Sequence, residues 1–294
     1  MTRITKGPGP MGVEELVETP DGRVLHTMVA GEGPDLVVLE AGLGFGGHYW
    51  APVHERLARR VRVVAYDRAG LGDSSPDPHP RDLDRLEADL GVLLDAYPHR
   101  RLVLVGHSWG GPVVRLAAAR RLDSARPITG VVLVDASDEH APGYFARQAA
   151  LGDAVQAATL PTLARVGLMR ALIAVAARGL EPVHRRGLLD SSTTVAAARA
   201  AVEENRHVRP GLRALLDRPL PLPDVPVTVI SGRRHGRLDA GLRRQLNRAH
   251  AVTAERHGGR LVFAERSGHL IPLSEPELIA REVLAMVEPA PEPA

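Results

Sequence analysis

A Gly-x-Ser-x-Gly motif at residues 106–110 constrains the fold of this chain more than any other feature of its sequence. An aliphatic run at 103–105 precedes the motif, and a pattern typical of a helix follows it at 112–121. In this context the serine lies on a tight turn from a strand into a helix, which pushes its hydroxyl out above the sheet. A Cβ at either glycine would collide with the neighbouring strand or helix. We therefore predict that Ser108 is a nucleophile, rather than an incidental serine in an ordinary βα turn.

Strand and helix patterns alternate on both sides of this motif. Leucines at helical spacing occur between 81 and 97, and further helices are expected near 50–60, 239–250 and 276–287. Strands are expected near 14–19, 23–30, 35–40, 61–66, 102–105, 130–135, 227–231 and 260–264. This alternation predicts an α/β fold, with a mostly parallel sheet flanked by helices.

The alternation breaks in the third quarter of the chain, where the sequence is rich in Ala, Leu and Arg and has no convincing strand. We expect residues 137–222 to form an all-helical cap over an apolar pocket. The cap would interrupt a core made of 13–136 and 223–288. The polar, Gly- and Pro-rich residues 1–12 are predicted to be a flexible N-terminus, and 289–294 a disordered tail.

Composition excludes several classes of protein. The 37 basic and 35 acidic residues nearly cancel, so charge gives no reason to expect a nucleic-acid partner. The chain has no cysteine, which excludes disulfides, thiolate catalysis and cysteine-ligated metals. It has neither a signal-peptide pattern nor an apolar run of about 18 residues. We expect a cytoplasmic protein, monomeric or homodimeric, that binds a small-molecule substrate and no membrane.

A serine hydroxyl needs a base within hydrogen-bond reach before it can act as a nucleophile. The best candidate is His269, which follows the last expected strand and precedes the last helix. Its loop would overhang the carboxyl edge of the sheet, where catalytic groups gather in α/β folds. His107 adjoins the serine, but its ring should point away from the hydroxyl and pack beneath the turn. His48 and His140 are expected at the surface, with a place in the pocket as the alternative.

The negative charge that develops during acyl transfer needs hydrogen-bond donors aimed at it in advance. Two backbone N–H groups suit this task, those of Trp109 at the start of a helix and of Leu43 in the loop after the third strand. Gly42 and Gly44 would let that loop fold tightly. The alternative is a simple flexible turn.

Together, the Gly-His-Ser-Trp-Gly-Gly turn, the glycine loop at 42–47 and the late Ser-Gly-His resemble the α/β-hydrolase superfamily, in its serine-nucleophile branch. The likeness runs from about 14 to 287, and residues 66–74 are similar to the family's Asp-Arg-x-Gly-x-Gly-x-Ser loop. It implies an eight-stranded, mostly parallel sheet and a helical cap after the sixth strand. It also implies a Ser-acid-His triad in that chain order, with no cofactor and no metal. Asp67 and Arg68 are usually structural in that loop.

The acid of the triad departs from the common pattern. In many relatives an aspartate lies three residues after the glycine that ends the seventh strand, but here that residue is His235. We favour Asp135, at the end of the sixth strand, because some branches of the superfamily place the acid there. The alternative acid is Asp239, which also suits a helix N-cap. Asp138 and Glu139 remain further candidates.

Glu40 departs from the family's pattern too, because the loop after the third strand often begins with His-Gly. A carboxylate that pointed into an oxyanion hole would repel the developing negative charge. We expect Glu40 to face an arginine or solvent instead.

Within this family, a serine nucleophile argues against the chemistry of epoxide hydrolases and haloalkane dehalogenases, which use aspartate. The leading interpretation is a carboxylic ester hydrolase that cleaves an ester, thioester or lactone through an acyl-serine. Its substrate would be small to medium and largely apolar, since the expected cap is mostly aliphatic. Acyl transfer, perhydrolysis, C–C bond cleavage and lyase or cyclase reactions use similar constellations. The alternative from another class is a ligand-binding protein with weak or no hydrolysis, which the displaced acid would suit.

Overall fold

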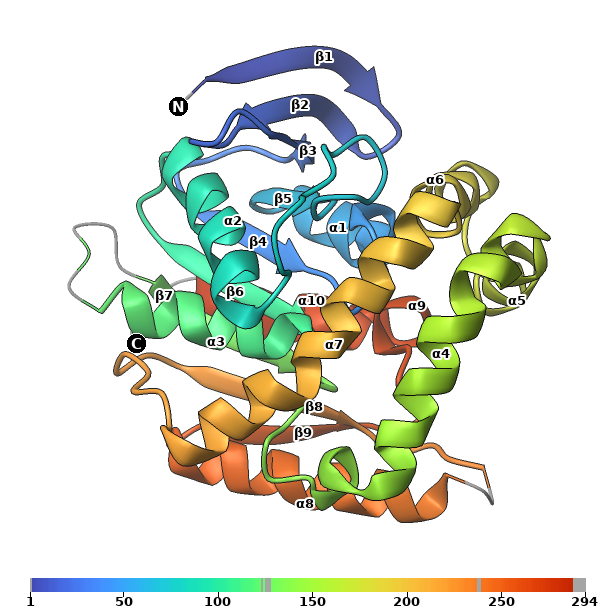
Figure 1. Ribbon diagram of the computed structural model, residues 1–294. Helices are drawn as coiled ribbons and strands as arrows, with labels where there is room; N and C mark the ends of the chain where they lie inside the picture. Colours follow the sequence, from blue (N-terminus) through green and yellow to red (C-terminus); the bar gives the residue numbers. More distant parts are fainter. Residues whose placement is uncertain (1, 123, 125–127, 237–238, 288–294) are drawn as a thin grey trace.

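One nine-stranded sheet forms the centre of the computed structural model, which describes residues 2–122, 124, 128–236 and 239–287 (Figure 1). Its order is β1-β2-β3-β5-β4-β6-β7-β8-β9. The strands are β1 (Arg3–Gly9), β2 (Gly12–Glu18), β3 (Val24–Ala30), β4 (Leu36–Glu40), β5 (Arg62–Tyr66), β6 (Leu102–His107), β7 (Ile128–Val134), β8 (Val227–Gly232) and β9 (Arg260–Ala264). Strands β4 to β9 pair in parallel, whereas β1, β2 and β3 pair antiparallel. The predicted α/β fold with a mostly parallel sheet is confirmed.

Successive residues of the central strands point to opposite faces, and both faces are buried. Leu36 and Val38 of β4 pack into one core, and Val37 and Leu39 pack into the other. The helices are α1 (Ala51–Ala58), α2 (Leu83–Ala96), α3 (Gly110–Arg120), α8 (Ala240–Arg256), α9 (Ile271–Ser274) and α10 (Pro276–Val287), with a short 3₁₀ turn, η1, at Gly47–Trp50. Helices α2, α3 and α8 supply the first core, and α1 and α10 the second. Coverage of both faces explains why these strands read as unbroken aliphatic runs.

The N-terminal segment corrects two expectations. Residues 3–9 are not a flexible N-terminus but the edge strand β1, so the sheet has nine strands rather than eight. Strand β1 pairs antiparallel with β2, with Ile4 opposite Leu16. Its side chains are mostly exposed, and it is held by backbone hydrogen bonds rather than by burial. A strand of that kind leaves no apolar alternation in the sequence.

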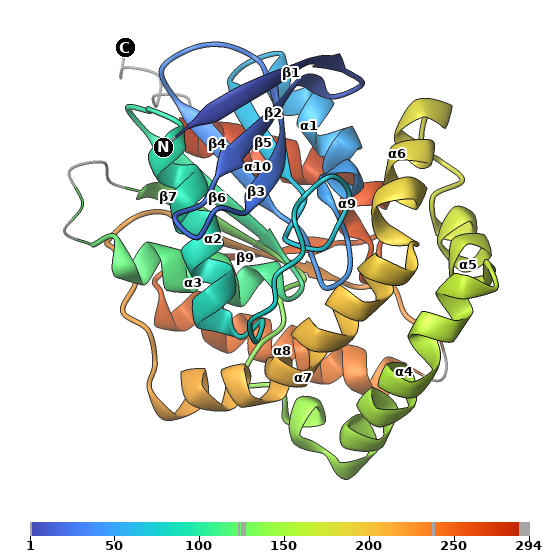
Figure 2. The same ribbon diagram turned by 45° about the horizontal axis from the view of Figure 1, so that its top comes forward.

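Only helices occur among the elements between β7 and β8. They are η2 (Pro142–Phe145), α4 (Arg147–Arg165), α5 (Leu168–Ala176), α6 (Pro182–Ser192) and α7 (Val195–Asp217). Figures 1 and 2 show α7 closest to the sheet, with α4 and α5 farther out. A Cβ on Gly211 of α7 would lie 2.8 Å from the Trp109 ring, so α7 packs directly over the turn after β6. The tail expected at 289–294 lies outside the described residues.

Candidate active site

The turn between β6 and α3 holds Ser108 in the left-handed region, with φ at 51°. Three backbone hydrogen bonds fix this conformation. The Ser108 N–H donates to the Val134 carbonyl at 3.1 Å, and the Ser108 carbonyl accepts from Gly111 at 3.0 Å and from Ser137 at 2.8 Å. A non-glycine residue at positive φ costs of order 1 kcal/mol, and it persists only where its surroundings hold it in place. The strand, the helix and the segment after β7 therefore act together to present this serine.

Both glycines of the motif lie at close backbone contacts, as predicted. A Cβ on Gly106 would lie 2.4 Å from the Gly110 carbonyl oxygen. A Cβ on Gly110 would lie 2.6 Å from the carbonyl oxygens of Glu40 and Ala41. Such separations are too short for any side chain, so the turn brings the start of α3 directly against the end of β4.

His269 comes from the loop between β9 and α9 and reaches the serine. Its Nε2 lies 3.0 Å from the Ser108 Oγ. Behind it the buried His107 ring donates from Nε2 to the His269 carbonyl at 2.9 Å, so it braces the loop from beneath the turn. Burial lowers the pKa of His107 to about 3, which keeps this ring neutral. His107 and His269 therefore differ in placement, one buried as a support and the other half-exposed at the serine.

Asp135 lies directly after β7, and its Oδ2 is 2.7 Å from the Nδ1 of His269. Its Oδ1 accepts from the Gly232 N–H at 2.9 Å, and Arg243 of α8 binds both carboxylate oxygens. Burial alone would raise the pKa of Asp135, but the hydrogen bonds from His269 and Arg243 outweigh it and hold the pKa well below its usual value. The carboxylate is thus charged and aimed at the imidazole. Sequence reasoning missed Arg243, one arginine among many with no motif around it.

The other candidate acids lie elsewhere. Asp239 precedes α8 and, within the described part of the chain, forms no hydrogen bond with His269. Asp138 accepts from the Thr253 hydroxyl at 2.6 Å. Glu139 forms a bidentate pair with Arg115 at 2.7 and 2.8 Å. The structure therefore brings only Asp135 of the four candidates to the histidine.

The loop after β4, which carries Leu43, lies against the serine. A Cβ on Gly42 would lie 3.0 Å from the Ser108 Cβ, so the loop touches the turn. The guanidinium of Arg68 donates to the carbonyls of Ala41 at 2.6 Å and Gly42 at 2.7 Å, which fixes the backbone just before Leu43. The Trp109 N–H stands at the start of α3, where the first N–H groups of a helix have no partner within it.

Arg68 also joins this loop to the helical segment above it. It pairs with Glu40 at 2.6 Å, as expected of a glutamate that faces an arginine, and with Glu204 of α7 at 2.7 Å. Arg81 pairs with the same Glu204 at 2.6 Å. All four side chains are buried. Burial raises the pKa of Glu40, whereas Arg68 and Arg81 overcome burial and lower the pKa of Glu204 below its usual value. Sequence analysis did not single out Glu204 or Arg81, because neither belongs to a motif.

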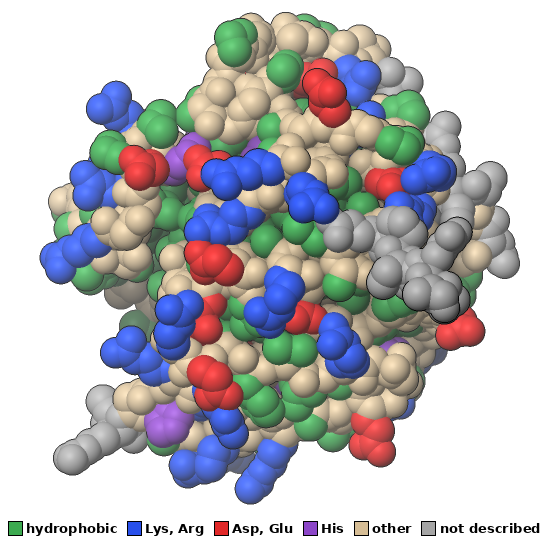
Figure 3. Space-filling model, turned by 180° about the vertical axis from the view of Figure 1, so that it is seen from behind, with side chains coloured by type: hydrophobic (Ala, Val, Ile, Leu, Met, Phe, Trp, Pro, Cys, Tyr) green, Lys and Arg blue, Asp and Glu red, His purple; other side chains and the backbone are tan. Residues whose placement is uncertain are grey.

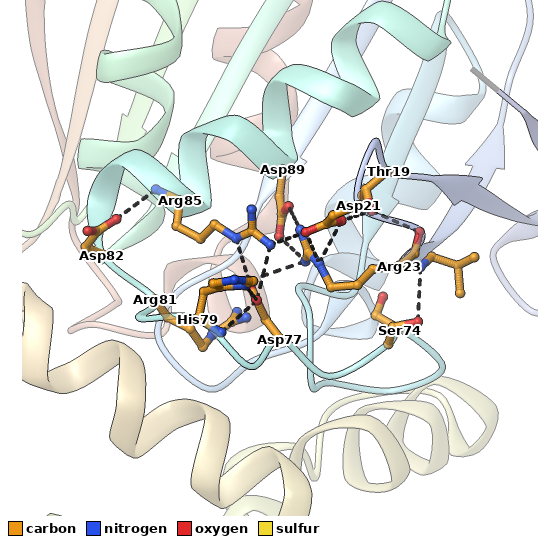
Figure 4. A network of polar contacts seen from close by, with 12 residues as sticks. Thr19, Asp21, Arg23, Ser74, Asp77, His79, Arg81, Asp82, Arg85 and Asp89 are labelled. Carbon is orange, nitrogen blue, oxygen red and sulfur yellow. Dashed lines mark hydrogen bonds and ion pairs between the residues drawn. The ribbon is translucent and has the colours of Figure 1, made fainter.

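The loop that carries Asp67 and Arg68 is anchored on both sides, which agrees with a structural role. Asp67 accepts from the Gly47 N–H at 2.8 Å and from His26 Nδ1 at 2.9 Å. Farther along, Arg85 binds Asp77 at 2.7 Å (Figure 4). The network in Figure 4 continues through Arg23, Asp21 and Asp89.

Among the described residues, two groups of carboxylates and histidine have ligand atoms close enough to hold a metal ion. The groups are Glu14, His26 and Asp73, and Asp138, Glu139 and His140. In the first, Lys6 pairs with Asp73. In the second, Arg115 pairs with Glu139. Their charges already have protein partners, and we assign no metal to either group.

His48 is buried rather than at the surface, in contact with Gly187, and His140 is partly buried beside Asp138.

Comparison with known proteins places this geometry in context. A model of the alpha/beta hydrolase family matches residues 36–282. "Putative carbamate hydrolase RutD" of Azorhizobium caulinodans is 35% identical over 102 residues, which make up 34% of this chain and 38% of the relative. "Epoxide hydrolase 4" of Mus musculus is 35% identical over 100 residues, 33% of this chain and 28% of the relative. The matched segments thus span well under half of these two relatives.

Similarity to solved structures extends over nearly the whole chain. A hydrolase from Pseudomonas aeruginosa PA01 superposes with a TM-score of 0.68 at 26% identity, covering 94% of this chain and 98% of that one. The enol-lactonase from Burkholderia xenovorans LB400 superposes with a TM-score of 0.60 at 24% identity, covering 90% of this chain and 96% of that one. At that identity the second likeness concerns the fold alone.

Proposed function

Because the chain belongs to the alpha/beta hydrolase family, we propose that it is a serine hydrolase with a Ser108-His269-Asp135 triad. The observation that carries the proposal is the continuous contact from the serine Oγ through the imidazole to the carboxylate, at 3.0 and 2.7 Å. Each member of the triad has the partner its role requires, and the nucleophile is presented on a strained turn. Asp239, the alternative acid, lacks such a contact within the described residues.

In this mechanism the Ser108 Oγ attacks the carbonyl carbon of the substrate while His269 Nε2 takes the hydroxyl proton. Asp135 stabilises the imidazolium that forms and keeps its own charge. The tetrahedral oxyanion accepts hydrogen bonds from the N–H groups of Leu43 and Trp109. His269 then gives its proton to the leaving oxygen, nitrogen or sulfur, which leaves an acyl-serine. Water, activated by the same histidine, attacks the acyl group and restores the free serine.

We propose an ester, thioester or lactone of a small to medium, largely apolar compound as the substrate. The apolar character of α7 supports this choice, because its Val208 and Leu212 belong to the same hydrophobic cluster as Trp109, the residue after the serine, and Leu43 packs against that cluster. A serine nucleophile also favours attack on a carbonyl over the opening of an epoxide. A carbamate and an enol-lactone, named for two similar proteins, both contain such a carbonyl.

A fluorophosphonate probe tests the proposal directly, because it labels an activated serine irreversibly. The purified protein should be labelled rapidly, and labelling should be lost in Ser108→Ala and His269→Ala. A folded protein that stays unlabelled, and that hydrolyses no p-nitrophenyl ester, would instead fit the alternative of a ligand-binding protein. Mass spectrometry of the labelled peptide would identify the reacting residue.

A further inference from the structure

The outer surfaces of α4 and α5 carry an unusual concentration of exposed aliphatic side chains. We call this surface the outer apolar face. Its six large side chains are between 47% and 69% exposed, and they are Leu151, Val155, Val166, Leu168, Leu172 and Val175. Half of the exposed large hydrophobic side chains in the described residues thus lie within 25 residues of chain. Clusters of this kind mark binding surfaces in stable monomers.

The spacing of these residues shows that they form a separate side of the helix, distinct from the side that packs against the protein. Leu168, Leu172 and Val175 are four and three residues apart, so they share one side of α5. Inward-facing positions of the same segment, such as Met169 and Ala177, are buried. The segment therefore has a filled inner side and a separate apolar outer side.

Basic side chains outnumber acidic ones in residues 151–180, the segment that carries the outer apolar face. From 154 to 180 the sequence contains no Asp or Glu, and its charged residues are Arg165, Arg170 and Arg178. Arg170 pairs with Asp190 at 2.9 Å, but Arg165 and Arg178 form no salt bridge with any other described residue. In Figure 3, seen from behind, hydrophobic and basic side chains lie next to each other at the left edge, on the side of α5, with acidic side chains among them. The segment of the outer apolar face therefore bears two exposed arginines that have no salt-bridge partner among the described residues.

The bent shape of α4 and α5 suits helices that lie on a membrane surface rather than helices that cross the membrane. No single described helix is long and apolar enough to cross a membrane, whereas α4 and α5 pass that test only together, and they meet at 94°. The bend is made at Gly167, whose φ is 75°, and it places the exposed Val166 and Leu168 on either side of a corner. A corner of this kind can enter the headgroup region of a bilayer while the helices lie along it.

We infer that the outer apolar face docks the protein onto an anionic lipid surface. Its aliphatic side chains would enter the interface, while Arg165 and Arg178 would reach the phosphate groups with their stems against the acyl chains. A second copy of the chain is a poorer occupant, because a two-fold contact would bring these arginines together, while Asp153, the one carboxylate between 151 and 180, already pairs with Arg209. This inference departs from the sequence-based expectation of no membrane partner, and it does not depend on the proposed catalytic function.

Sedimentation of the full-length protein with lipid vesicles tests the inference. We expect binding to phosphatidylcholine vesicles in which about a third of the lipid is phosphatidylglycerol, weaker binding at high salt, and little binding to phosphatidylcholine alone. Leu172→Asp/Val175→Asp should lower the partition coefficient roughly tenfold or more, because it places charges in the apolar interface. The matched control is Leu242→Asp/Val252→Asp, the same change at two exposed positions of α8, which should bind like the unaltered protein.

A second variant keeps the test decisive if the acidic one fails to fold. Arg165→Gln/Arg178→Gln should weaken binding by about fivefold per arginine and flatten its salt dependence. Circular dichroism would show that each variant is folded. Failure of the unaltered protein to bind anionic vesicles, or equal loss in the α8 control, would overturn the inference. So would a dimer in size-exclusion chromatography that Leu172→Asp/Val175→Asp dissociates, since the face would then be an interface between two copies.

Discussion

Arg243 binds both oxygens of the Asp135 carboxylate, with Nη1 at 2.5 Å from Oδ1 and Nη2 at 3.0 Å from Oδ2. The same Oδ2 faces the His269 Nδ1 at 2.7 Å. The carboxylate is therefore held between a helix and the histidine loop, in a buried setting where it could not easily reorient. Arg243 is a positioning residue: it acts on the histidine only through Asp135.

The first prediction concerns this pair. Arg243→Met should lower the free energy of unfolding by about 3–5 kcal/mol, because it removes one partner of a buried ion pair and leaves the other charged. Urea unfolding measures the change. Arg244→Met is the control on the same helix, since Arg244 is exposed, and it should alter stability by no more than about 0.5 kcal/mol. Equal effects of the two substitutions would show that the pair contributes nothing.

The second prediction distinguishes the two candidate acids. Asp135→Asn should lower kcat for a short-chain p-nitrophenyl ester by about 10⁴, because the amide cannot keep His269 in the required tautomer. Asp239→Asn should stay within a few-fold of the unaltered enzyme. The reverse pattern would transfer the role of the acid to Asp239. A thermal melt of both variants separates a loss of chemistry from a loss of fold.

Much of this site was predictable because its signals are local. Gly-x-Ser-x-Gly places a serine on a turn by steric necessity, and the position of His269 after the last parallel strand follows from the shared carboxyl edge of the sheet. The buried strands β4 to β8 were predictable for a similar reason, since burial on both faces requires unbroken aliphatic runs.

The parts of the site that could not be predicted from the sequence depend on contacts between residues that are far apart in the chain. Asp135 and Asp239 are both carboxylates near the same edge, and the contact of Asp135 with His269, 134 residues later in the chain, is what separates them. The Arg68–Glu204 pair spans 136 residues for the same reason. Periodicity shows that α5 has an apolar side, but it cannot tell which side meets the protein. The outer apolar face therefore became visible only in three dimensions.

The third prediction concerns the loop after β4. Gly42→Ala should lower kcat by about 10² to 10³, the cost of losing one oxyanion donor, because its Cβ would lie 2.8 Å from the His107 Nδ1 and push the loop away from Ser108. Gly152→Ala is the control, since nothing lies within 4 Å of that Cβ. This control should keep full activity and gain up to about 1 kcal/mol of stability, because alanine favours the helix. Unchanged kcat in Gly42→Ala would place the oxyanion hole elsewhere.

The last prediction follows from the neutral histidine beneath the turn. Burial lowers the pKa of His107 from 6.5 to about 3, so the unfolded chain binds a proton at pH values where the folded one does not. Stability that is present at neutral pH should therefore be lost as the pH falls from about 6.5 toward 3, by up to about 1.4 kcal/mol per pH unit for this group. His107→Gln retains a donor for the His269 carbonyl but cannot titrate, so its stability should fall less steeply between about pH 6 and 4. Chemical denaturation of both proteins at several pH values measures the slope. If His107→Gln kept the full slope, the acid sensitivity would have to come from other groups, and His107 would not be the buried neutral support that its contacts indicate.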